Sequence, residues 1–380
     1  MKRIAIALVV ALVVGLLPIR AGAQPAQVSA KSAILMDAAT GTVLYEQNAH
    51  EKLAPASVTK VMTMLLIMEA IEDGRIGWDD MVTTSEAAAG KGGSQVYLKV
   101  GETMTVTDML KSIAVSSAND CACAMAEHIA GSEEAFVELM NQRAVELGMA
   151  DTHFVNCTGL DDGPDASSHL TCAYDIAVMS RELLVKHPKI KEFTTIWMDT
   201  IRNGAFGLAN TNKLVRFYPG ATGLKTGFTA NAGYCLSAAA QREGMELITV
   251  VMGSETSQDR FAACKQLLDY GFANYALITP EVQSGQVSVK LGNAPYANAA
   301  PTEDPRLLID RSQRGSVTTE ISLDEQVSAP VSKGQRLGTL TVHAGQQVLA
   351  QIPMVAQEAV PRLRWGQVFY MVMRAFSMGG

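Results

Sequence analysis

A largely apolar run without glycine or proline spans residues 61–71 and predicts a helix. Its residues are good helix formers, and a helix that is apolar on most sides is buried. Two further helices are expected over residues 108–116 and 120–129, joined by a short turn, and a fourth over residues 260–275. The middle of the chain is therefore expected to contain several packed helices.

Strand patterns follow in the second half of the chain. Two strand-like segments, 233–241 and 247–252, flank the turn pair Glu243-Gly244 and predict a hairpin. We place residues 225–227 on the preceding strand, where a sheet edge could pair with an extended peptide. Further strands are predicted over residues 287–289, 306–309, 317–323, 338–343 and 347–355.

The change of pattern divides the chain. Residues 279–285, which contain Pro280 and Gly285, indicate a linker. We therefore expect a mixed domain of helices and strands over residues 24–280 and a small β-rich domain over residues 281–361. The length of 380 residues and an apolar content of 48% are sufficient for two hydrophobic cores.

The first segment has the layout of a secretory signal. Lys2 and Arg3 precede an apolar run over residues 4–17, and Ala21-Gly-Ala23 offers small residues for cleavage. We predict a signal peptide over residues 1–23, and hence export to the extracytoplasmic face of the membrane. The alternative is an N-terminal membrane anchor, which the short run disfavours.

The last segment, residues 362–380, combines aromatic residues, methionines and three arginines. It is too short to cross a bilayer. We predict an amphipathic helix at the membrane surface, with arginines toward anionic headgroups. The alternative is a terminal helix that packs on the β-rich domain.

Charge and motifs exclude other classes of function. The chain has 31 basic and 38 acidic side chains, for a net charge of −7. Such a balance argues against nucleic acid as a partner. No P-loop, dinucleotide fingerprint or paired-histidine motif is visible, so neither a metal nor another cofactor is expected.

Six cysteines, a small number for this length, indicate no disulfide scaffold. Cys157 and Cys172 bracket a loop rich in Asp, Gly and Ser, and they are the only pair for which we consider a disulfide. The alternative is that they remain free, because buried free cysteine behaves as a small apolar residue.

Ser57 and Lys60 open the first predicted helix, three residues apart. This spacing puts the hydroxyl and the amine on one face, about one turn apart. A buried amine with a lowered pKa could act as the base that activates the hydroxyl. A Ser and a Lys that merely share a helix face would produce the same string.

Ser117 and Asn119 lie on the turn between the second and third predicted helices. Ser117 offers a hydroxyl for proton transfer, and Asn119 offers donors and acceptors for a substrate amide. The alternative is that either residue caps the following helix.

Lys225, Thr226 and Gly227 form the third string. Lys225 could supply a second cation near the amine of Lys60, and Gly227 permits a close backbone approach. An ordinary turn could carry the same three residues.

Together, the strings Ser57-x-x-Lys60, Ser117-x-Asn119 and Lys225-Thr-Gly227 are known for penicillin-binding proteins and class A β-lactamases. The second lies 60 residues after the first, and the third 108 residues after the second. From about Ser32 to the C-terminus, the chain resembles the serine-type D-Ala-D-Ala carboxypeptidases, the low-molecular-mass penicillin-binding proteins. Further matching segments are residues 32–45, 48–59 and 152–160, with His169 and residues 173–175.

The resemblance implies a β-lactamase/transpeptidase-like α/β (α+β) fold, in which helices flank an antiparallel sheet. It also implies an inserted helical subdomain and a C-terminal β domain. It implies that Ser57 is acylated, that Lys60 is its base and that Ser117 and Asn119 assist. It also implies that Lys225 shapes the site and that Thr226 and Arg260 hold the terminal carboxylate of the substrate. The backbone N–H groups of Ser57 and Phe228 would form the oxyanion hole. Some relatives have a histidine in place of Phe228, and some an arginine in place of Asn210, so substrate preference could differ.

The implied function is removal of the terminal D-Ala from peptidoglycan pentapeptides, with β-lactams as covalent inhibitors. One alternative is a β-lactamase, but no Glu-x-x-Leu-Asn string of the class A enzymes lies between Asn119 and Lys225. The other is a noncatalytic penicillin-binding scaffold, which the complete motifs disfavour.

Overall fold

The computed structural model describes residues 27–302, 305–366 and 368–369. The predicted signal peptide and most of the predicted terminal segment lie outside these residues. The chain forms two compact units that divide between Asn274 and Tyr275, rather than at the predicted boundary of 280/281. The boundary falls earlier because residues directly after Asn274 already pair with a strand of the second unit.

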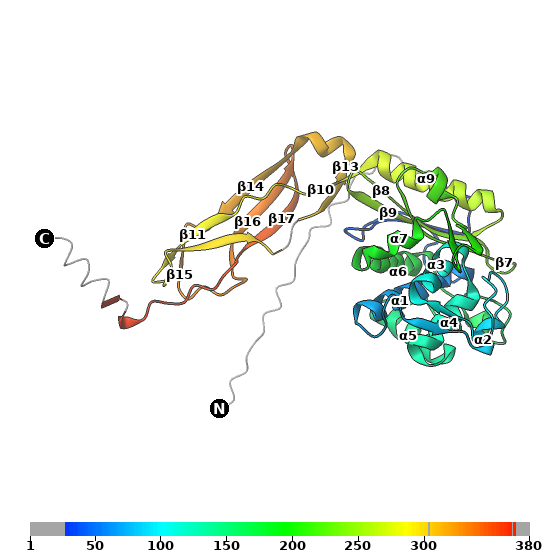
Figure 1. The fold of residues 1–380 in the computed structure, drawn as a ribbon. Coiled ribbons are helices and arrows are strands. Elements are labelled where there is room, and N and C mark those ends of the chain that lie inside the picture. Colours follow the sequence, from blue (N-terminus) through cyan, green and yellow to red (C-terminus); the bar gives the residue numbers. More distant parts are fainter. Residues whose placement is uncertain (1–26, 303–304, 367, 370–380) are drawn as a thin grey trace, which may run out of the picture. The chain divides into compact units, whose positions relative to one another are not determined.

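The first unit is built on a five-stranded sheet in which every neighbouring pair is antiparallel (Figure 1). From edge to edge, the strands are β2 (Val43–Gln47), β1 (Ser32–Asp37), β9 (Met245–Ser254), β8 (Gly233–Arg242) and β7 (Ala221–Thr229). The strand that carries the third string, β7, therefore lies at an edge. Two short hairpins accompany the sheet: β3 (Met81–Thr83) with β4 (Thr103–Thr105), and β5 (Met198–Ile201) with β6 (Phe206–Ala209).

Helices cover both faces of this sheet, and most of them come from the long segment between β2 and β7 (Figure 1). The α-helices are α1 (Lys60–Glu72), α2 (Glu86–Ala89), α3 (Val106–Ser116), α4 (Asn119–Ala130), α5 (Glu133–Glu146), α6 (Ala173–Lys186), α7 (Lys191–Thr194), α8 (Leu214–Phe217) and α9 (Ser257–Asn274). The 3₁₀ turns are η1 (Ala56–Thr59), η2 (Ala166–Ser168) and η3 (Pro188–Ile190).

Strand alternation separates the two faces. Ile34 and Ile248 belong to the core that also contains α1 and α6. Leu35 and Leu247, one residue along, touch α9 at Gly271, where a Cβ would lie only 2.4 Å from Leu247. Because successive side chains point to opposite faces, both faces of the sheet are apolar and both are covered by helices.

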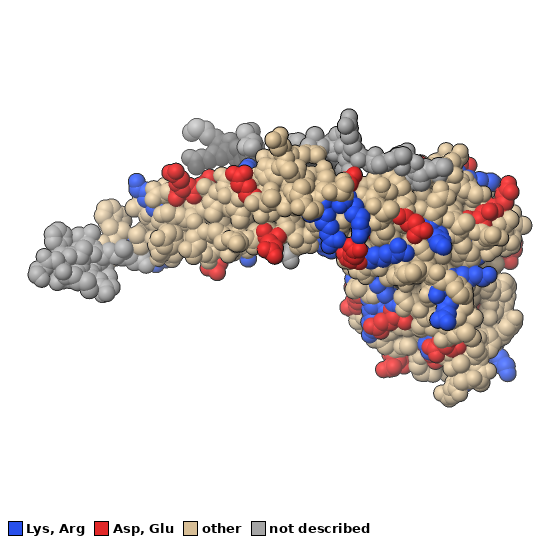
Figure 2. Space-filling model, turned by 90° about the horizontal axis from the view of Figure 1, so that it is seen from above, with Lys and Arg blue, Asp and Glu red and all other residues tan. Residues whose placement is uncertain are grey.

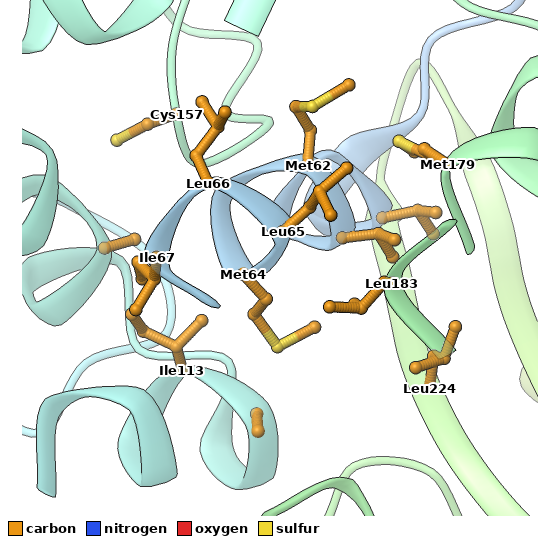
Figure 3. Packing of buried hydrophobic residues seen from close by; sticks show 14 of the residues in the cluster. Met62, Met64, Leu65, Leu66, Ile67, Ile113, Cys157, Met179, Leu183 and Leu224 are labelled. Carbon is orange, nitrogen blue, oxygen red and sulfur yellow. The ribbon is translucent and has the colours of Figure 1, made fainter. Parts of the chain in front are cut away.

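The helix α1 is buried along most of its length, as its apolar sequence predicts. Figure 3 shows its side chains leaving in several directions, with Leu66 extending toward Cys157 and Ile67 toward Ile113. A helix fixed on all sides gives its first residue, Lys60, little freedom to move.

The second unit contains a six-stranded sheet with its own apolar core. The strands, in order, are β14 (Val317–Leu323), β16 (Arg336–Ala344), β17 (Gln347–Ala356), β12 (Tyr296–Pro301), β11 (Gly285–Lys290) and β15 (Gln326–Ser328). Beside it, β10 (Tyr275–Ile278) pairs with β13 (Leu307–Asp310), which η4 (Arg311–Ser316) follows. The predicted C-terminal all-β domain is confirmed.

All six cysteines are free thiols and buried, so the disulfide that we considered between Cys157 and Cys172 is absent. Among the described residues, no helix has the length and apolarity needed to span a membrane. Figure 2 shows acidic and basic side chains interspersed over the visible face of the first unit, rather than gathered into a field of one sign.

Candidate active site

Ser57 and Lys60 are hydrogen-bonded to each other. Ser57 lies in η1 and is partly exposed, whereas Lys60 is the first residue of α1 and is fully buried. The Lys60 Nζ donates to the Ser57 Oγ over 3.0 Å. A partly exposed serine is therefore in direct contact with a buried amine.

The environment of Lys60 favours the neutral amine. Burial lowers the pKa of Lys60 to about 7, although the nearby Cys157 thiol and Asp120 carboxylate act in the opposite direction. The Nζ also donates to the Thr158 carbonyl oxygen over 2.7 Å. This second bond fixes the amine beside the serine.

The Thr158 carbonyl is held by a turn within residues 152–160, a segment to which the sequence analysis assigned no role in the site. The Asn156 Oδ1 accepts N–H bonds from Thr158 at 3.1 Å and from Gly159 at 2.6 Å. Gly159 has a φ of +81°, and a Cβ there would lie 1.8 Å from the Ala56 carbonyl oxygen. Asn followed three residues later by Gly is the sequence signal that could have identified this turn.

The second string lies where α3 ends and α4 begins. Ser117 closes α3 in the left-handed conformation, with φ 64° and ψ 28°, which is uncommon for a residue other than glycine. Asn119 is the first residue of α4, and no side chain caps this helix, so the capping alternative is wrong for both residues. Instead, the Asn119 Nδ2 donates to the Gly92 carbonyl at 2.7 Å.

The buried carboxylate of Asp120 orders the loop that precedes this turn. It accepts backbone N–H bonds from Val96 at 3.1 Å and from Leu98 at 3.0 Å. The Asn119 N–H donates to the Ser94 carbonyl at 2.7 Å. The strained turn at Ser117 is therefore fixed from outside the two helices that it joins.

Lys225 and Thr226 lie on the edge strand β7, and both are buried. Burial lowers the pKa of Lys225, and the positive charges of Lys60 and Arg260 act in the same direction. The Lys225 Nζ donates to the Thr226 carbonyl at 2.9 Å. The structure therefore brings the amines of the first and third strings into electrostatic contact.

Thr211, which sequence reasoning did not single out, links the second and third strings. The Thr226 Oγ1 donates to the Thr211 Oγ1 at 2.7 Å. The Thr211 N–H donates to the Val115 carbonyl at 3.1 Å, near the end of α3. One residue thus ties β7 to the helix that carries Ser117.

Gly227 lets β7 approach η1 closely. A Cβ at this position would lie 2.7 Å from the Pro55 carbonyl oxygen and 3.1 Å from the Ser57 nitrogen. The backbone of Ser57 therefore lies against the segment that continues to Phe228. The Phe228 side chain is exposed, and its ring contacts that of Tyr234 at a tilt of 31°, with centroids 4.3 Å apart.

Arg260 lies in α9 and is nearly buried, with 8% of its surface exposed. Its Nη1 donates to the Gly227 carbonyl at 2.8 Å and to the Cys235 carbonyl at 3.3 Å. The guanidinium therefore supports the strand that carries the third string.

Asn210, where some relatives have an arginine, is also buried, and its Nδ2 donates to the Ile196 carbonyl at 2.7 Å.

His169 connects the loop after α5 to η1. The Val155 N–H donates to the His169 Nδ1 at 3.0 Å, so the proton of the neutral ring resides on Nε2. That nitrogen lies 2.8 Å from the Thr59 Oγ1, which in turn donates to the Ala56 carbonyl at 2.9 Å. Burial lowers the pKa of His169 to about 4 and keeps the ring neutral.

The site combines a partly exposed serine, a buried amine of lowered pKa that is hydrogen-bonded to it, a second buried lysine and a strand at the edge of the sheet. Among the described residues, the His, Cys, Asp and Glu side chains that lie close enough together to hold a metal ion are outside the three strings. Fold and site together define a serine-type peptidase of the penicillin-binding class.

The comparisons identify the family. The sequence model described as D-alanyl-D-alanine carboxypeptidase matches residues 19–256, and that of the penicillin-binding protein 5 C-terminal domain matches residues 273–362. The chain belongs to the D-alanyl-D-alanine carboxypeptidase family, and it is a serine-type carboxypeptidase and a hydrolase. The resemblance inferred from the three strings is confirmed.

Individual relatives cover most of the chain. The D-alanyl-D-alanine carboxypeptidase DacF of Bacillus subtilis is 45% identical over 336 residues, which are 87% of this chain and 85% of the relative. The crystal structure of penicillin-binding protein 5 from Haemophilus influenzae has a TM-score of 0.78 at 30% identity and covers 90% of this chain and 100% of its own. Penicillin-binding protein D2 of Listeria monocytogenes, solved in its ampicillin-bound form, has a TM-score of 0.60 at 32% identity over 66% of this chain and 100% of its own.

Proposed function

We propose that Ser57 is the nucleophile that removes the terminal D-Ala from peptidoglycan stem peptides ending in D-Ala-D-Ala. The observation that carries this proposal is the 3.0 Å bond between the Lys60 Nζ and the Ser57 Oγ, together with the pKa of about 7 for Lys60. Near neutral pH, a large fraction of the amine is unprotonated and able to accept the hydroxyl proton.

The acylation step follows from this arrangement. Lys60 takes the proton of Ser57 as the Oγ attacks the carbonyl carbon of the penultimate D-Ala. The backbone N–H groups of Ser57 and Phe228 receive the developing oxyanion. When the C–N bond breaks, the proton passes through Lys60 and Ser117 to the departing amine of D-Ala. The products of this step are free D-Ala and an ester on Ser57.

The remaining residues hold the substrate. Asn119 binds the amide of the stem peptide, which lies along the edge strand β7. Thr226 and Arg260 bind the terminal carboxylate, and Lys225 shapes the site. Water then attacks the ester, returns the proton of Ser57 and releases the trimmed peptide.

β-Lactams are proposed to acylate the same serine. Support comes from the solved structure of the Listeria relative with ampicillin bound. In a β-lactam the leaving nitrogen stays tethered to the acyl group, so the departure that completes acylation of a peptide does not occur. The drug therefore remains on the enzyme as an inhibitor.

One pair of assays tests the function and separates it from the two alternatives. The purified chain is incubated with diacetyl-Lys-D-Ala-D-Ala and, separately, with penicillin. We expect release of D-Ala and slow turnover of the drug. Rapid drug turnover without release of D-Ala would favour a β-lactamase, and neither product would favour a scaffold.

Substitution of Ser57 tests its role directly. Ser57→Ala removes the nucleophile, so we expect no labelling by a fluorescent penicillin and loss of D-Ala release by at least about 1,000-fold. Lys60→Ala is expected to reduce both activities because it removes the base. Labelling of the Ser57→Ala variant at the wild-type rate would contradict the assignment of the nucleophile.

We also propose that the protein is exported and held at the extracytoplasmic membrane surface by residues 362–380. Support comes from the signal-like layout of residues 1–23 and from the aromatic residues, methionines and arginines of residues 362–380. Trp365 (89%) and Phe369 (67%) are exposed, while the Leu363 N–H donates to the Leu291 carbonyl of the second unit at 2.9 Å. N-terminal sequencing of the mature protein should begin at Gln24. A chain that ends at residue 361 should no longer sediment with anionic lipid vesicles.

A further inference from the structure

Three metal-ligating side chains converge on the first unit, outside the catalytic strings. They are His50, in the loop after β2, Asp151, in the turn after α5, and Cys172, directly before α6. One donor atom from each lies within 4.8 Å of the other two. The His50 Nδ1 is 3.2 Å from the Asp151 Oδ2, and the Cys172 Sγ is 3.9 Å from that same oxygen.

These separations fit a tetrahedral ion. Donors at about 2.0–2.3 Å from a tetrahedral Zn²⁺ lie roughly 3.3–3.8 Å from one another, which is the edge of the coordination polyhedron. The distances from the Asp151 Oδ2 to the histidine nitrogen and to the thiol, 3.2 and 3.9 Å, are within a few tenths of an ångström of that interval, and the histidine nitrogen and the thiol lie within 4.8 Å of each other. Small rotations of the side chains would be enough for all three to reach one ion.

Backbone hydrogen bonds already hold the contributing segments together. Leu53 and Thr171 exchange N–H bonds at 2.8 and 3.0 Å, and the Tyr174 N–H donates to the Ala49 carbonyl at 2.9 Å. The His50 ring contacts the Tyr174 ring at a tilt of 30°, with centroids 4.8 Å apart. The three ligands are thus brought together by the fold rather than gathered by the ion.

The site is open on one side. The His50 side chain is 61% exposed and that of Asp151 is 27% exposed, whereas Cys172 forms the buried floor. Lys52 approaches the other carboxylate oxygen, Oδ1, at 3.5 Å and leaves Oδ2 directed toward the histidine and the thiol. An ion can enter from solvent and retain a water molecule in its fourth position.

We propose that His50 Nδ1, Asp151 Oδ2 and Cys172 Sγ form a binding site for Zn²⁺ or a chemically similar transition-metal ion. Imidazole and thiolate ligands favour such ions over Ca²⁺ and Mg²⁺, which prefer oxygen ligands. The bound ion links the loop after β2 to the N-terminus of α6 and stabilises the first unit. None of the three ligands belongs to the peptidase site, so the proposal is independent of the proposed catalytic roles.

Cobalt is a spectroscopic probe for this site. The full mature chain, purified without a histidine tag and with reduced thiols, is titrated with Co²⁺, because coordination by a thiolate produces a strong near-ultraviolet charge-transfer band. We expect one equivalent of Co²⁺ to bind and the band to appear. Zn²⁺ should displace the Co²⁺ and remove the band. Cys172→Ser should abolish the band, and His50→Ala should weaken Co²⁺ binding at least about tenfold.

Matched controls replace the same residue types elsewhere. Cys264→Ser removes another buried thiol, and His128→Ala removes another exposed imidazole, so both should bind Co²⁺ like the wild type. Zn²⁺ should raise the unfolding temperature of the wild type and of both controls, but not that of His50→Ala. D-Ala release should remain unchanged in every variant.

Three results would overturn the proposal: no near-ultraviolet band in the wild type, a band that persists in Cys172→Ser, or equal Co²⁺ affinity in His50→Ala and His128→Ala. If Cys172→Ser fails to fold, the comparison of His50→Ala with His128→Ala still decides, because both positions are exposed.

Discussion

A single buried amine determines how the candidate active site responds to pH. Lys60 has no exposed surface, and its Nζ donates to one hydroxyl and one carbonyl. Neither partner carries a charge that would compensate for the lost hydration of the ammonium form. The burial of α1 therefore also lowers the pKa of Lys60, which allows the amine to act as a base near neutral pH.

The pH dependence of acylation should reflect this group. Because the pKa of Lys60 is lowered to about 7, the neutral base is scarce at pH 5.5 and dominant at pH 8.5. We expect kcat/KM for D-Ala release to rise about tenfold per pH unit below pH 7 and then to level off. Stopped assays across this range measure the profile, and a flat profile from pH 5.5 to 8.5 would contradict the role of Lys60 as base.

The backbone around position 227 leaves no room for a side chain, so only glycine fits there. An added Cβ would meet the Pro55 carbonyl at 2.7 Å and push β7 away from η1. Because this displacement would misplace the proposed oxyanion donors, we expect Gly227→Ala to lower the acylation rate by about 100-fold. Gly207→Ala is the matched control, since its Cβ would have no atom within 4 Å. Fluorescent-penicillin labelling rates compare the two, and equal rates would refute this account.

At the scale of elements, the sequence predicts the regular structure better than the loops. The helix expected over residues 108–116 is α3 (Val106–Ser116), and the strand expected over residues 317–323 is β14. Period and apolar content are local signals, so they suffice for these elements. The strand β12 was missed because Tyr296–Pro301 is rich in alanine, contains an asparagine and ends in proline, residues that are depleted in strands.

The loop that carries His169 should make stability sensitive to acid. The ring is neutral in the folded chain because burial lowers its pKa from 6.5 to about 4, whereas in the unfolded chain it protonates near 6.5. Between these values the unfolded state binds more protons, so folding stability is complete above pH 6.5 and is lost as the pH falls toward 4. The loss attributable to this group is about 3 kcal/mol.

A neutral replacement isolates this contribution. His169→Gln has no titrating group, so its free energy of unfolding should fall less steeply between pH 6.5 and pH 4 than that of the wild type. Urea unfolding at several pH values provides the measurement, and His128→Gln, at an exposed position, is the control. If His169→Gln and the wild type have the same slope, the buried histidine is not responsible.

At the scale of the whole molecule, the sequence predicted the contact between Ser57 and Lys60 and the proximity of Lys60 to Lys225, but not the contacts that hold these residues in place. The three strings were identifiable because each has a recognisable order. Thr158 and Thr211 were not, since they act through a backbone carbonyl and through a bridging position that only the fold creates. The sequence also did not predict the cluster of His50, Asp151 and Cys172, because their proximity depends on the folding of three segments that are distant in sequence.

The two units have separate hydrophobic cores, and every residue of the candidate active site lies before Asn274. The pairing of β10 with β13 belongs wholly to the second unit, so a cut after Asn274 leaves no strand of the first unit without its partner. A fragment of residues 24–274 should therefore fold and release D-Ala from a soluble peptide within about twofold of the full chain. Circular dichroism establishes folding and D-Ala release measures activity. A folded but inactive fragment would show that the second unit contributes to catalysis, and an unfolded one would show that the cores depend on each other.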